Sequence, residues 1–435
     1  MRRFLWTALA SLLLLWVAGG PGHSATISVG DGFDYETISA AISNATDGDI
    51  LLVAPGVYDT TRGETFPLRP TAAITIRASS EDARPVIRTE HISRTFAFDN
   101  IDSATLEGLE ITPGELTAFQ IRSSTVTIRN SKTSNENAGQ PQGLIDATDS
   151  VVELVGCQIS HFLDMRNGST ISCTRSRLIL KDCEFLTSTR TVGFGLLIRG
   201  DRCPEVILEN SSFREMQPVI GPLILLDNRS EPIGGLTIED CTMTESGSSS
   251  FLIQYENYNA NIRRLNLSDN TGGRPDDPGY ALSAVGGTTQ LVESNISNNE
   301  SIGGAQVISG TLSVEHSTIE GNGGDGLSAE YLYLNDSIVR DNGGVGVSAN
   351  HFQIENAEIS NNGYAGIVHL TSPLTLEGPS AATDTAISGN GERLSQYSGS
   401  LDILAAGVHV RRNSHFTRCQ VMENRKETNN GSAGV

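Results

Sequence analysis

Residues 317–363 read STIEGNGGDGLSAEYLYLNDSIVRDNGGVGVSANHFQIENAEISNNG and contain three copies of one frame of twenty residues. Each copy opens on a small residue, at Ser317, Ser337 and Ala357. An apolar residue stands three places before and two places after each of them, and an Asn follows five places after. A period of this length is typical of a solenoid, in which each short coil buries its apolar side against the next.

The same frame recurs through most of the chain, and we count thirteen copies between Leu109 and Cys419, spaced 20 to 34 residues apart. The small-residue column comprises Cys157, Cys183, Ser211, Cys241, Ser294, Ser317, Ser337, Ala357 and Cys419, with weaker copies at Leu109, Ser131, Leu265 and Thr385. Apolar and polar residues alternate within a frame, which indicates strands, and Gly-Asn turns follow them. The pattern predicts an all-β parallel solenoid, and the handedness of parallel connections favours a right-handed coil.

The first 24 residues have the pattern of a secretory signal. Arg2 and Arg3 precede an apolar run from Phe4 to Val17, and small residues end at Ser24, after which we expect cleavage. We therefore divide the chain into a signal (1–24), an N-terminal cap with the first coils (25–88), the parallel coils (89–425) and a polar tail (426–435). No other stretch is apolar enough for a membrane span, so we expect a secreted or periplasmic protein.

The charge of the chain narrows the expected partners. The formal net charge is −21, and only three of the basic residues are Lys. This balance disfavours nucleic acid and anionic membranes, and also polyanionic glycans unless a cation or a local basic patch bridges them. Both tryptophans, Trp6 and Trp16, lie in the signal, so an indole platform for sugars is not expected.

The segment after the signal predicts a short helix. Ile38, Ala41, Ile42 and Ala45 have helical spacing, and a strand is expected at 50–53. The run Tyr35-Glu36-Thr37-Ile38, Gly48-Asp49-Ile50 and Pro55-Gly56-Val57-Tyr58 resembles the N-terminal cap of pectin-lyase-like right-handed β-helix proteins. The run from Gly63 to Leu68 resembles a domain of unknown function found at that cap in secreted bacterial proteins. The Asn-Gly coils are similar to those of the NosD-like and polyuronate-epimerase branch. The resemblance implies a β-helix with a capping helix at its start.

Members of this superfamily include lyases, hydrolases, esterases, epimerases and adhesins, so catalytic residues have to be sought one by one. Asp276 and Asp277 form an Asp pair, and paired carboxylates are what glycoside hydrolysis needs, although the surrounding residues also suit an exposed turn. His161, Asp164 and Arg166 could form an acid–base group, or simply a polar turn. The motifs that mark the known hydrolases, lyases and esterases of the superfamily are missing.

Aromatic, sulfur and amide side chains supply the remaining candidates. Tyr255, Tyr258 and Tyr280 could stack on sugars, although the first two are better explained as rings that pack against the coils. Cys157 and Cys183 should stack on adjacent coils, either as small buried residues or as a disulfide, and Cys173 could pair with Cys203. Asn322, Asn342 and Asn362 should form a structural ladder of side-chain amides.

We expect no resident cofactor and no metal site of the zinc or haem type, although Asp-rich turns could hold Ca²⁺. The sequence favours a secreted β-helix protein that binds or remodels an extracellular polysaccharide along one sheet face. If it is an enzyme, a lyase, an epimerase or a glycoside hydrolase is expected. The alternative is a non-catalytic structural or adhesive surface protein, and a NosD-type accessory role is disfavoured by the scattered His residues. The oligomeric state is left open.

Overall fold

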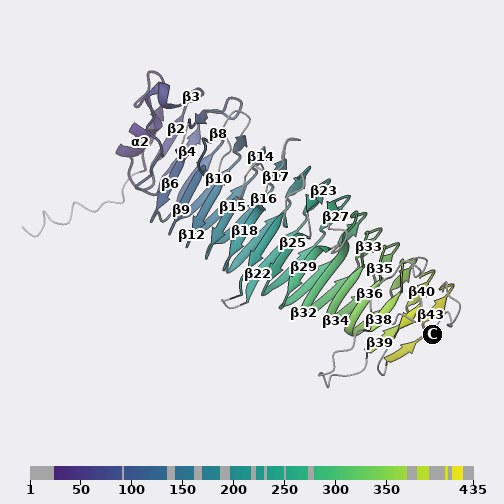
Figure 1. Ribbon diagram of the computed structural model, residues 1–435. Helices are drawn as coiled ribbons and strands as arrows, with labels where there is room; N and C mark the ends of the chain where they lie inside the picture. The colour runs from purple at the N-terminus through teal and green to yellow at the C-terminus, as the bar shows by residue number, and fades with distance from the viewer. Residues whose placement is uncertain are drawn as a thin grey trace, which may run out of the picture.

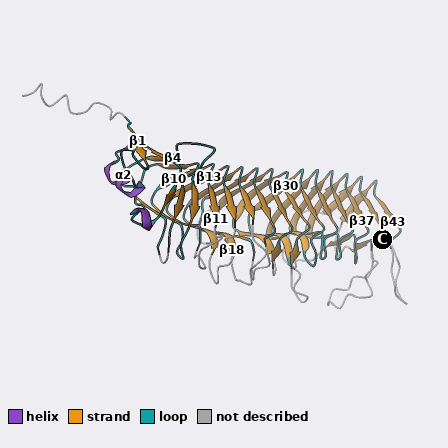
Figure 2. Cartoon of the chain, turned by 90° about the horizontal axis from the view of Figure 1, so that it is seen from above, coloured by secondary structure: helices purple, strands orange, loops and turns teal. Residues whose placement is uncertain are grey.

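The computed structural model describes residues 24–90, 93–134, 143–160, 169–186, 196–216, 222–229, 233–248, 251–272, 279–369, 380–390, 407–409 and 414–424. The described chain forms a rod of stacked parallel strands, with helix α2 (Ile38–Asn44) near one end and the last strand near the other (Figure 1). Seen from a second direction, the strands of successive coils lie in rows along the rod, joined by short loops (Figure 2).

Each coil contributes strands to three faces of the rod, which we call faces A, B and C in chain order. Face A consists of β6 (Phe96–Asp99), β9 (Phe119–Arg122), β12 (Ile145–Thr148), β15 (Ser169–Thr174), β18 (Leu196–Asp201), β21 (Ile224–Asp227), β25 (Phe251–Glu256), β29 (Tyr280–Val285), β38 (Ile367–His369) and β41 (Val408–His409), with the first parts of β32 (Gly303–Glu315), β34 (Leu327–Asn335) and β36 (Val347–Glu355).

Face B runs alongside face A. It consists of β1 (Thr26–Val29), β2 (Ile50–Val53), β4 (Thr75–Ala78), β7 (Ala104–Glu107), β10 (Thr125–Arg129), β13 (Val151–Val155), β16 (Arg177–Lys181), β19 (Glu205–Glu209), β22 (Gly234–Glu239), β26 (Tyr258–Arg263), β30 (Thr288–Val292), β39 (Ser380–Thr383) and β42 (Ser414–Thr417), with the second parts of β32, β34 and β36. Because these three long strands belong to both faces, A and B form one continuous sheet of 26 strands.

Face C is a separate sheet of 15 short strands. They are β3 (Val57–Tyr58), β5 (Val86–Arg88), β8 (Glu110–Thr112), β11 (Lys132–Ser134), β14 (Gln158–Ser160), β17 (Glu184–Leu186), β20 (Ser212–Arg214), β23 (Thr242–Thr244), β27 (Asn266–Ser268), β31 (Asn295–Ser297), β33 (Thr318–Glu320), β35 (Ile338–Arg340), β37 (Glu358–Ser360), β40 (Ala386–Ser388) and β43 (Gln420–Met422). A turn of 3₁₀ helix (Thr60–Arg62) and a small pair, β24 (Gly247–Ser248) with β28 (Thr271–Gly272), complete the described elements.

The thirteen sequence frames coincide with the corner between faces B and C. Every small-residue position, from Leu109 to Cys419, is followed directly by a strand of face C. The residue before each position has a left-handed backbone, with φ between 45° and 70°. These corner residues are Gly108, Asn130, Gly156, Asp182, Asn210, Asp240, Arg264, Glu293, His316, Asp336, Asn356, Asp384 and Arg418. None is β-branched, which agrees with the steric cost of that conformation.

The small residues are explained by the tight bend that follows this left-handed residue. The Ser317 hydroxyl donates to the carbonyl of Glu315 at 2.8 Å and accepts the N–H of Ser294 on the preceding coil at 3.1 Å. Ser337 repeats the arrangement, since it accepts the N–H of Ser317 at 3.1 Å. Each hydroxyl therefore satisfies two buried backbone groups that the bend removes from the sheet.

A ladder of asparagine side chains follows the corner between faces C and A. Its members are Asn270, Asn299, Asn322, Asn342, Asn362, Asn390 and Asn424. The Nδ2 of Asn342 donates to Oδ1 of Asn362 at 3.0 Å and to the carbonyl of Ile319 at 3.0 Å, and its own Oδ1 accepts from Nδ2 of Asn322 at 2.9 Å. The ladder satisfies buried amides and carbonyls in every coil from Asn270 onward.

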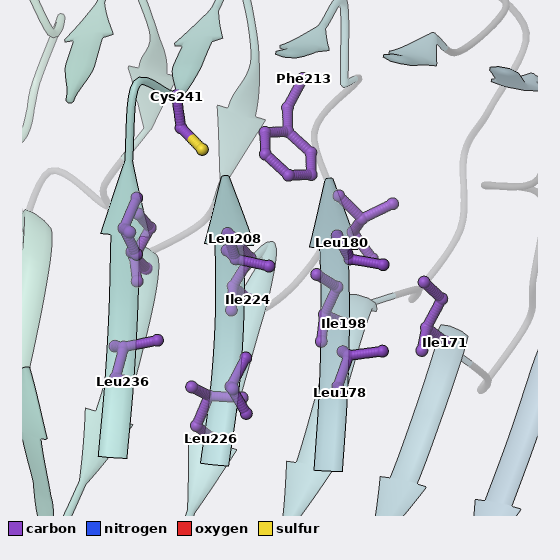
Figure 3. Close-up of a cluster of buried hydrophobic side chains, with 14 of the residues drawn as sticks. Ile171, Leu178, Leu180, Ile198, Leu208, Phe213, Ile224, Leu226, Leu236 and Cys241 are labelled. Carbon is purple, nitrogen blue, oxygen red and sulfur yellow. The ribbon is translucent and has the colours of Figure 1, made fainter. Parts of the chain in front are cut away.

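The interior is a single apolar core that runs along the rod. Inward side chains of faces A and B meet there, as Leu178 and Leu180 of β16 do beside Ile198 of β18 (Figure 3). Phe185 and Phe213 of face C stack on adjacent coils, with ring centroids 4.9 Å apart. Because parallel coils are in register, one position in the frame gives a column of like side chains inside the rod.

Helix α2 begins after Thr37, whose hydroxyl accepts the N–H of Ala40 at 3.2 Å. The Glu64 carboxylate accepts the N–H groups of Ile38 and Ser39 at 2.6 and 2.9 Å, which satisfies two more donors of the first turn. Ile38, Ala41 and Ile42 are buried. The helix is thus placed at one end of the rod, whereas its function as a cap remains a prediction.

All six cysteines have free thiols in the structure. Cys157 and Cys183 lie in the small-residue column, buried on adjacent coils, and the Cys157 thiol donates to the carbonyl of Ile128 at 3.3 Å. Cys173 and Cys203 are also buried, and the Cys203 thiol contacts the carbonyl of Cys173 at 3.4 Å. Cys157 and Cys183 could be either small buried residues or a disulfide, and in the structure they are small buried residues.

We predict that Val339→Asp abolishes folding. Val339 is the inward residue of β35 and has no solvent exposure, so the substitution would bury a charge between coils. Ile338→Asp, at the outward position next to it, is the matched control and should fold. Circular dichroism and thermal melting of both variants would check this, and a folded Val339→Asp protein with an unchanged melting point would contradict the frame assignment.

We predict that Asn342→Ala lowers the free energy of unfolding by roughly 3 kcal/mol or more, because it leaves several buried amide and carbonyl groups without partners. Asn261→Ala, on the exposed side of β26, should change stability by less than about 0.5 kcal/mol. Chemical denaturation of the two variants measures the difference. Equal effects would mean that the ladder does not stabilise the stack.

Candidate functional site

Face A carries two outward columns of side chains that run from coil to coil. The first column comprises Gln120, Asp146, Ser172, Arg199, Leu225, Gln254, Ser283 and Gln306, of which Gln120 and Ser283 are buried. The second, two residues further along each strand, comprises Arg122, Thr148, Thr174, Asp201, Asp227, Glu256, Val285 and Ile308. Charged and amide groups thus follow one another at the spacing of the coils, about 4.8 Å.

Three carboxylates occupy successive coils of the second column. Asp201 is in register with Asp227, and Asp227 with Glu256. Like charges this close repel one another unless cations lie between them. Arg229 supplies one, since its guanidinium lies 2.7 Å from an Asp227 oxygen and 3.1 Å from a Glu256 oxygen, and Arg202 lies 3.3 Å from Asp201.

These ion pairs set the chemistry of the carboxylates. Hydrogen bonds from Arg229 hold the pKa of Asp227 below its usual range. At neutral pH, Asp227 is therefore an ionised acceptor of hydrogen bonds and a poor proton donor. The carboxylates can accept hydrogen bonds from hydroxyl groups of a ligand, because each is still partly exposed.

Arg122, Asp146 and Arg199 differ from these pairs. Arg122 and Arg199 are exposed and Asp146 is partly exposed, and none of the three has an ion-pair or side-chain hydrogen-bond partner within the described ranges. Arg199 lies two residues before Asp201 on β18, on the same side of the strand. A guanidinium in this state can bind a carboxylate of a ligand with two parallel hydrogen bonds.

A hollow of about 530 Å³ lies beside these columns at the corner between faces A and B. Ser123, Asp149, Arg175 and Arg177 are among the residues that line it. Arg175 binds Asp149 through two contacts of 2.7 and 2.6 Å, and Arg177 pairs with Glu205. Its main charges are thus bound within the protein, which leaves face A as the better site for a charged ligand.

A second group of interest is the pair Tyr280 and Asp325, near the corner between faces C and A. The Tyr280 hydroxyl donates to an Asp325 oxygen at 3.3 Å, and the other Asp325 oxygen accepts the N–H of Val345 at 2.7 Å. Burial raises the pKa of Asp325 above its usual range. A carboxyl group in this condition can keep a proton at a pH where ordinary carboxyls are ionised.

The sequence candidates fall in three different places. Tyr280 belongs to the pair just described. Of the two alternatives open for Tyr255 and Tyr258, stacking on sugars or packing against the coils, the structure has the second, because both rings are buried in the core. Their hydroxyls bind Thr289 at 2.7 Å and the carbonyl of Cys203 at 2.9 Å.

The other candidates lie outside the described residues. His161, Asp164 and Arg166 belong to the connection from β14 of face C to β15 of face A, and Asp276 and Asp277 belong to the connection that precedes β29. Both connections lead into face A. Because these five residues are not among the described ones, their assignment as site residues remains a prediction.

The acidic column was missed, although a signal for it exists. Residues 197–201 read LIRGD, 223–227 read LILLD and 252–256 read LIQYE, so an acid stands three places after the same Leu-Ile pair in three coils. A comparison of the three residues that follow each Leu-Ile pair would have revealed the acidic column. Asp325 had no such signal, because its contact with Tyr280 spans 45 residues of sequence.

Within the described ranges, no three side chains of His, Cys, Asp or Glu converge in a way that could hold a metal ion. Among the described elements, no helix combines the length and the apolar composition needed to cross a bilayer.

We predict that Asp325→Asn makes the protein relatively more stable as the pH rises. A carboxyl whose pKa is raised by folding contributes stability below its unfolded value, near 3.8, and loses it as the pH increases through the folded value. Asn cannot ionise and keeps an acceptor for Val345. The melting temperature of the variant should therefore rise relative to that of the natural protein as the pH increases above about 4.

The control is Asp102→Asn, which changes an exposed carboxyl that has no ion pair or side-chain hydrogen bond within the described ranges. Its melting temperature should follow the natural protein across the same range. Parallel curves for Asp325→Asn and the natural protein would show that Asp325 titrates as an ordinary carboxyl.

Two family models match parts of the chain. A family model described as a right-handed β-helix region matches residues 224–380, and one described as a protein of unknown function (DUF1565) matches residues 26–82. The second match covers α2 and the first strands of face B. No curated protein matches the chain.

Several solved structures are similar to the chain at low identity. An alginate lyase of polysaccharide lyase family 6, in complex with a trisaccharide, is 12% identical with a TM-score of 0.38, over 96% of this chain and 92% of that one. The A-module of a mannuronan C-5 epimerase from Azotobacter vinelandii, AlgE6, is 10% identical with a TM-score of 0.36, over 89% and 94%. The catalytic domain of an α-1,3-glucanase of glycoside hydrolase family 87, in complex with nigerose, is 9% identical with a TM-score of 0.31, over 93% and 66%.

At these values the structural similarities say nothing about which reaction, if any, this chain performs. The family model, by contrast, falls on coils whose parallel register, corner residues and asparagine ladder have been described above. The chain is an all-β parallel solenoid, and its residues 224–380 match the right-handed β-helix family model.

Proposed function

We propose that this protein is exported and binds an extracellular polysaccharide that carries carboxylate groups along face A. The observation that carries the proposal is the pair of outward columns, in which Arg122 and Arg199 have no ion-pair partner among the described residues. A polymer repeats along its length and so does the rod, so successive sugar units can contact successive coils.

The two kinds of charge on face A have complementary tasks in this proposal. Arg199 binds a ligand carboxylate, and Asp201, Asp227 and Glu256 accept hydrogen bonds from the sugar hydroxyls. The overall charge of −21 repels a polyanion at long range, so the unpaired guanidinium groups are the local basic sites that make contact possible. Several weak contacts along one polymer add up to useful affinity.

A second candidate function is chemical remodelling of the same polysaccharide, favoured by the Tyr280–Asp325 pair. A protonated carboxyl beside a tyrosine hydroxyl is a suitable acid–base group for proton transfer to or from a sugar. Incubation with uronate-containing and neutral polysaccharides, with and without Ca²⁺, followed by mass spectrometry, tests for cleaved, unsaturated or epimerised products. A folded protein that yields no product retains only the binding role.

We also infer that α2 covers the apolar end of the first coil. The burial of Ile38, Ala41 and Ile42 at the end of the rod supports this, because a solenoid needs a terminal cover to remain soluble.

We predict that Arg199→Ala weakens binding of an oligogalacturonate or oligomannuronate by about tenfold or more, the loss expected for one charge-assisted contact. The matched control is Arg214→Ala, because Arg214 is exposed on face C of the same coil and has no ion-pair partner within the described ranges. Isothermal titration calorimetry at two salt concentrations measures both, and binding should weaken as salt rises.

Equal losses for Arg199→Ala and Arg214→Ala would point to nonspecific attraction and would contradict a site on face A. No binding of any uronate oligomer by the folded protein would favour the structural or adhesive role instead.

A further inference from the structure

The outward side chains of face B differ in charge between the early and the later coils of the rod. Near the N-terminal end its outward side chains are largely engaged in contacts between coils: Arg129 lies 3.8 Å and Thr127 lies 3.2 Å from Glu153, and Lys181 lies 2.9 Å from Glu209. In that part of the face, charged side chains of one coil are thus paired with side chains of the next.

Further along, one outward column of the same face becomes uncharged. It comprises Thr237, Asn261, Gln290, Ser313, Tyr333 and Gln353, in register on successive coils. None of these side chains hydrogen-bonds to another residue of the described chain. On face C, by comparison, Asn295 donates to Asn266 of the preceding coil at 3.0 Å. Amides in register on this rod can therefore bind one another, whereas the amides of the uncharged column on face B do not.

Aromatic rings lie within and beside the column. Tyr333 is 44% exposed, which is unusual for so large a side chain on this rod. Tyr331 and His351 occupy the neighbouring outward column, with ring centroids 5.1 Å apart and ring planes at 12°. The stacked Tyr331 and His351 rings thus lie in the outward column next to that of Tyr333, whose neighbours in its own column are Ser313 and Gln353.

We propose that this strip of face B, centred on Tyr333, is a second binding site and that its ligand is an uncharged oligosaccharide or polysaccharide. A pyranose ring has an apolar face that packs on an aromatic ring and an edge of hydroxyls that needs donors and acceptors. Tyr333 supplies the flat apolar surface, and the amides of Gln290 and Gln353 supply both donors and acceptors.

The chemistry of the strip separates this ligand from the one proposed for face A. The column has no cation to bind a carboxylate, and Glu315 and Glu355 in the adjacent outward column would repel an anionic polymer. A neutral glycan avoids this cost, and its binding should depend little on salt. The inference is independent of the proposed function, because it uses another face and other residues.

The test measures binding of laminarihexaose, maltohexaose and cellohexaose, with an oligogalacturonate as the charged comparison, by calorimetry on the full chain. We expect at least one neutral hexamer to bind, with an affinity that changes less than twofold between low and high salt. Tyr333→Ala should weaken that binding by about tenfold or more, as expected for the loss of an aromatic ring that the bound ligand covers. Tyr333→Phe should retain most of it, because the ring remains.

Three controls make the result decisive. Phe33→Ala removes another exposed aromatic ring, which is 56% exposed and lies between β1 and α2, and should leave binding unchanged. Arg199→Ala should weaken binding of the uronate oligomer and leave that of the neutral hexamer unchanged, which separates the two sites. Unchanged melting temperatures show that the variants fold. The proposal is overturned if no neutral hexamer binds, or if Tyr333→Ala binds it as the natural protein does.

Discussion

The corner between faces B and C is the constraint on which the rest of the structure depends. At each of thirteen coils, one residue adopts a left-handed backbone and the next is placed inside a tight bend. The bend limits the second residue mainly to Ser, Cys, Ala or Thr, and a serine hydroxyl there satisfies backbone groups of two coils. Because the corner repeats in register, each strand pairs with the same positions of its neighbours.

In-register stacking has opposite consequences inside and outside the rod. Inside, like residues in a column stabilise one another, as in the aromatic pair of Phe185 and Phe213 and in the asparagine ladder. Outside, like residues in a column place like charges about one coil apart, which is unfavourable unless an opposite charge intervenes. Arg229, between Asp227 and Glu256, is an example of such a neutralising residue.

The same stacking gives the surface its capacity for function. An outward column is a row of equally spaced groups, so its composition determines which polymer it suits. Face A carries guanidinium and carboxylate groups, and the later part of face B carries amides, hydroxyls and aromatic rings. Exposed groups that already have partners, as on the early part of face B, contribute to the stack and offer less to a ligand.

The sequence by itself determined the repeat, the strands of face C and the ladder of Asn322, Asn342 and Asn362, because these depend on contacts between equivalent positions of adjacent coils. The corner conformation explains why the repeat is so visible: only a few residue types fit it. Tertiary structure alone decided the direction of side chains that lie outside the repeated frame. Tyr255 and Tyr258 illustrate this, since a strand alternates inward and outward and both rings point inward. The Tyr280–Asp325 contact likewise needed the coordinates, because it joins residues from different coils that have no common position in the frame.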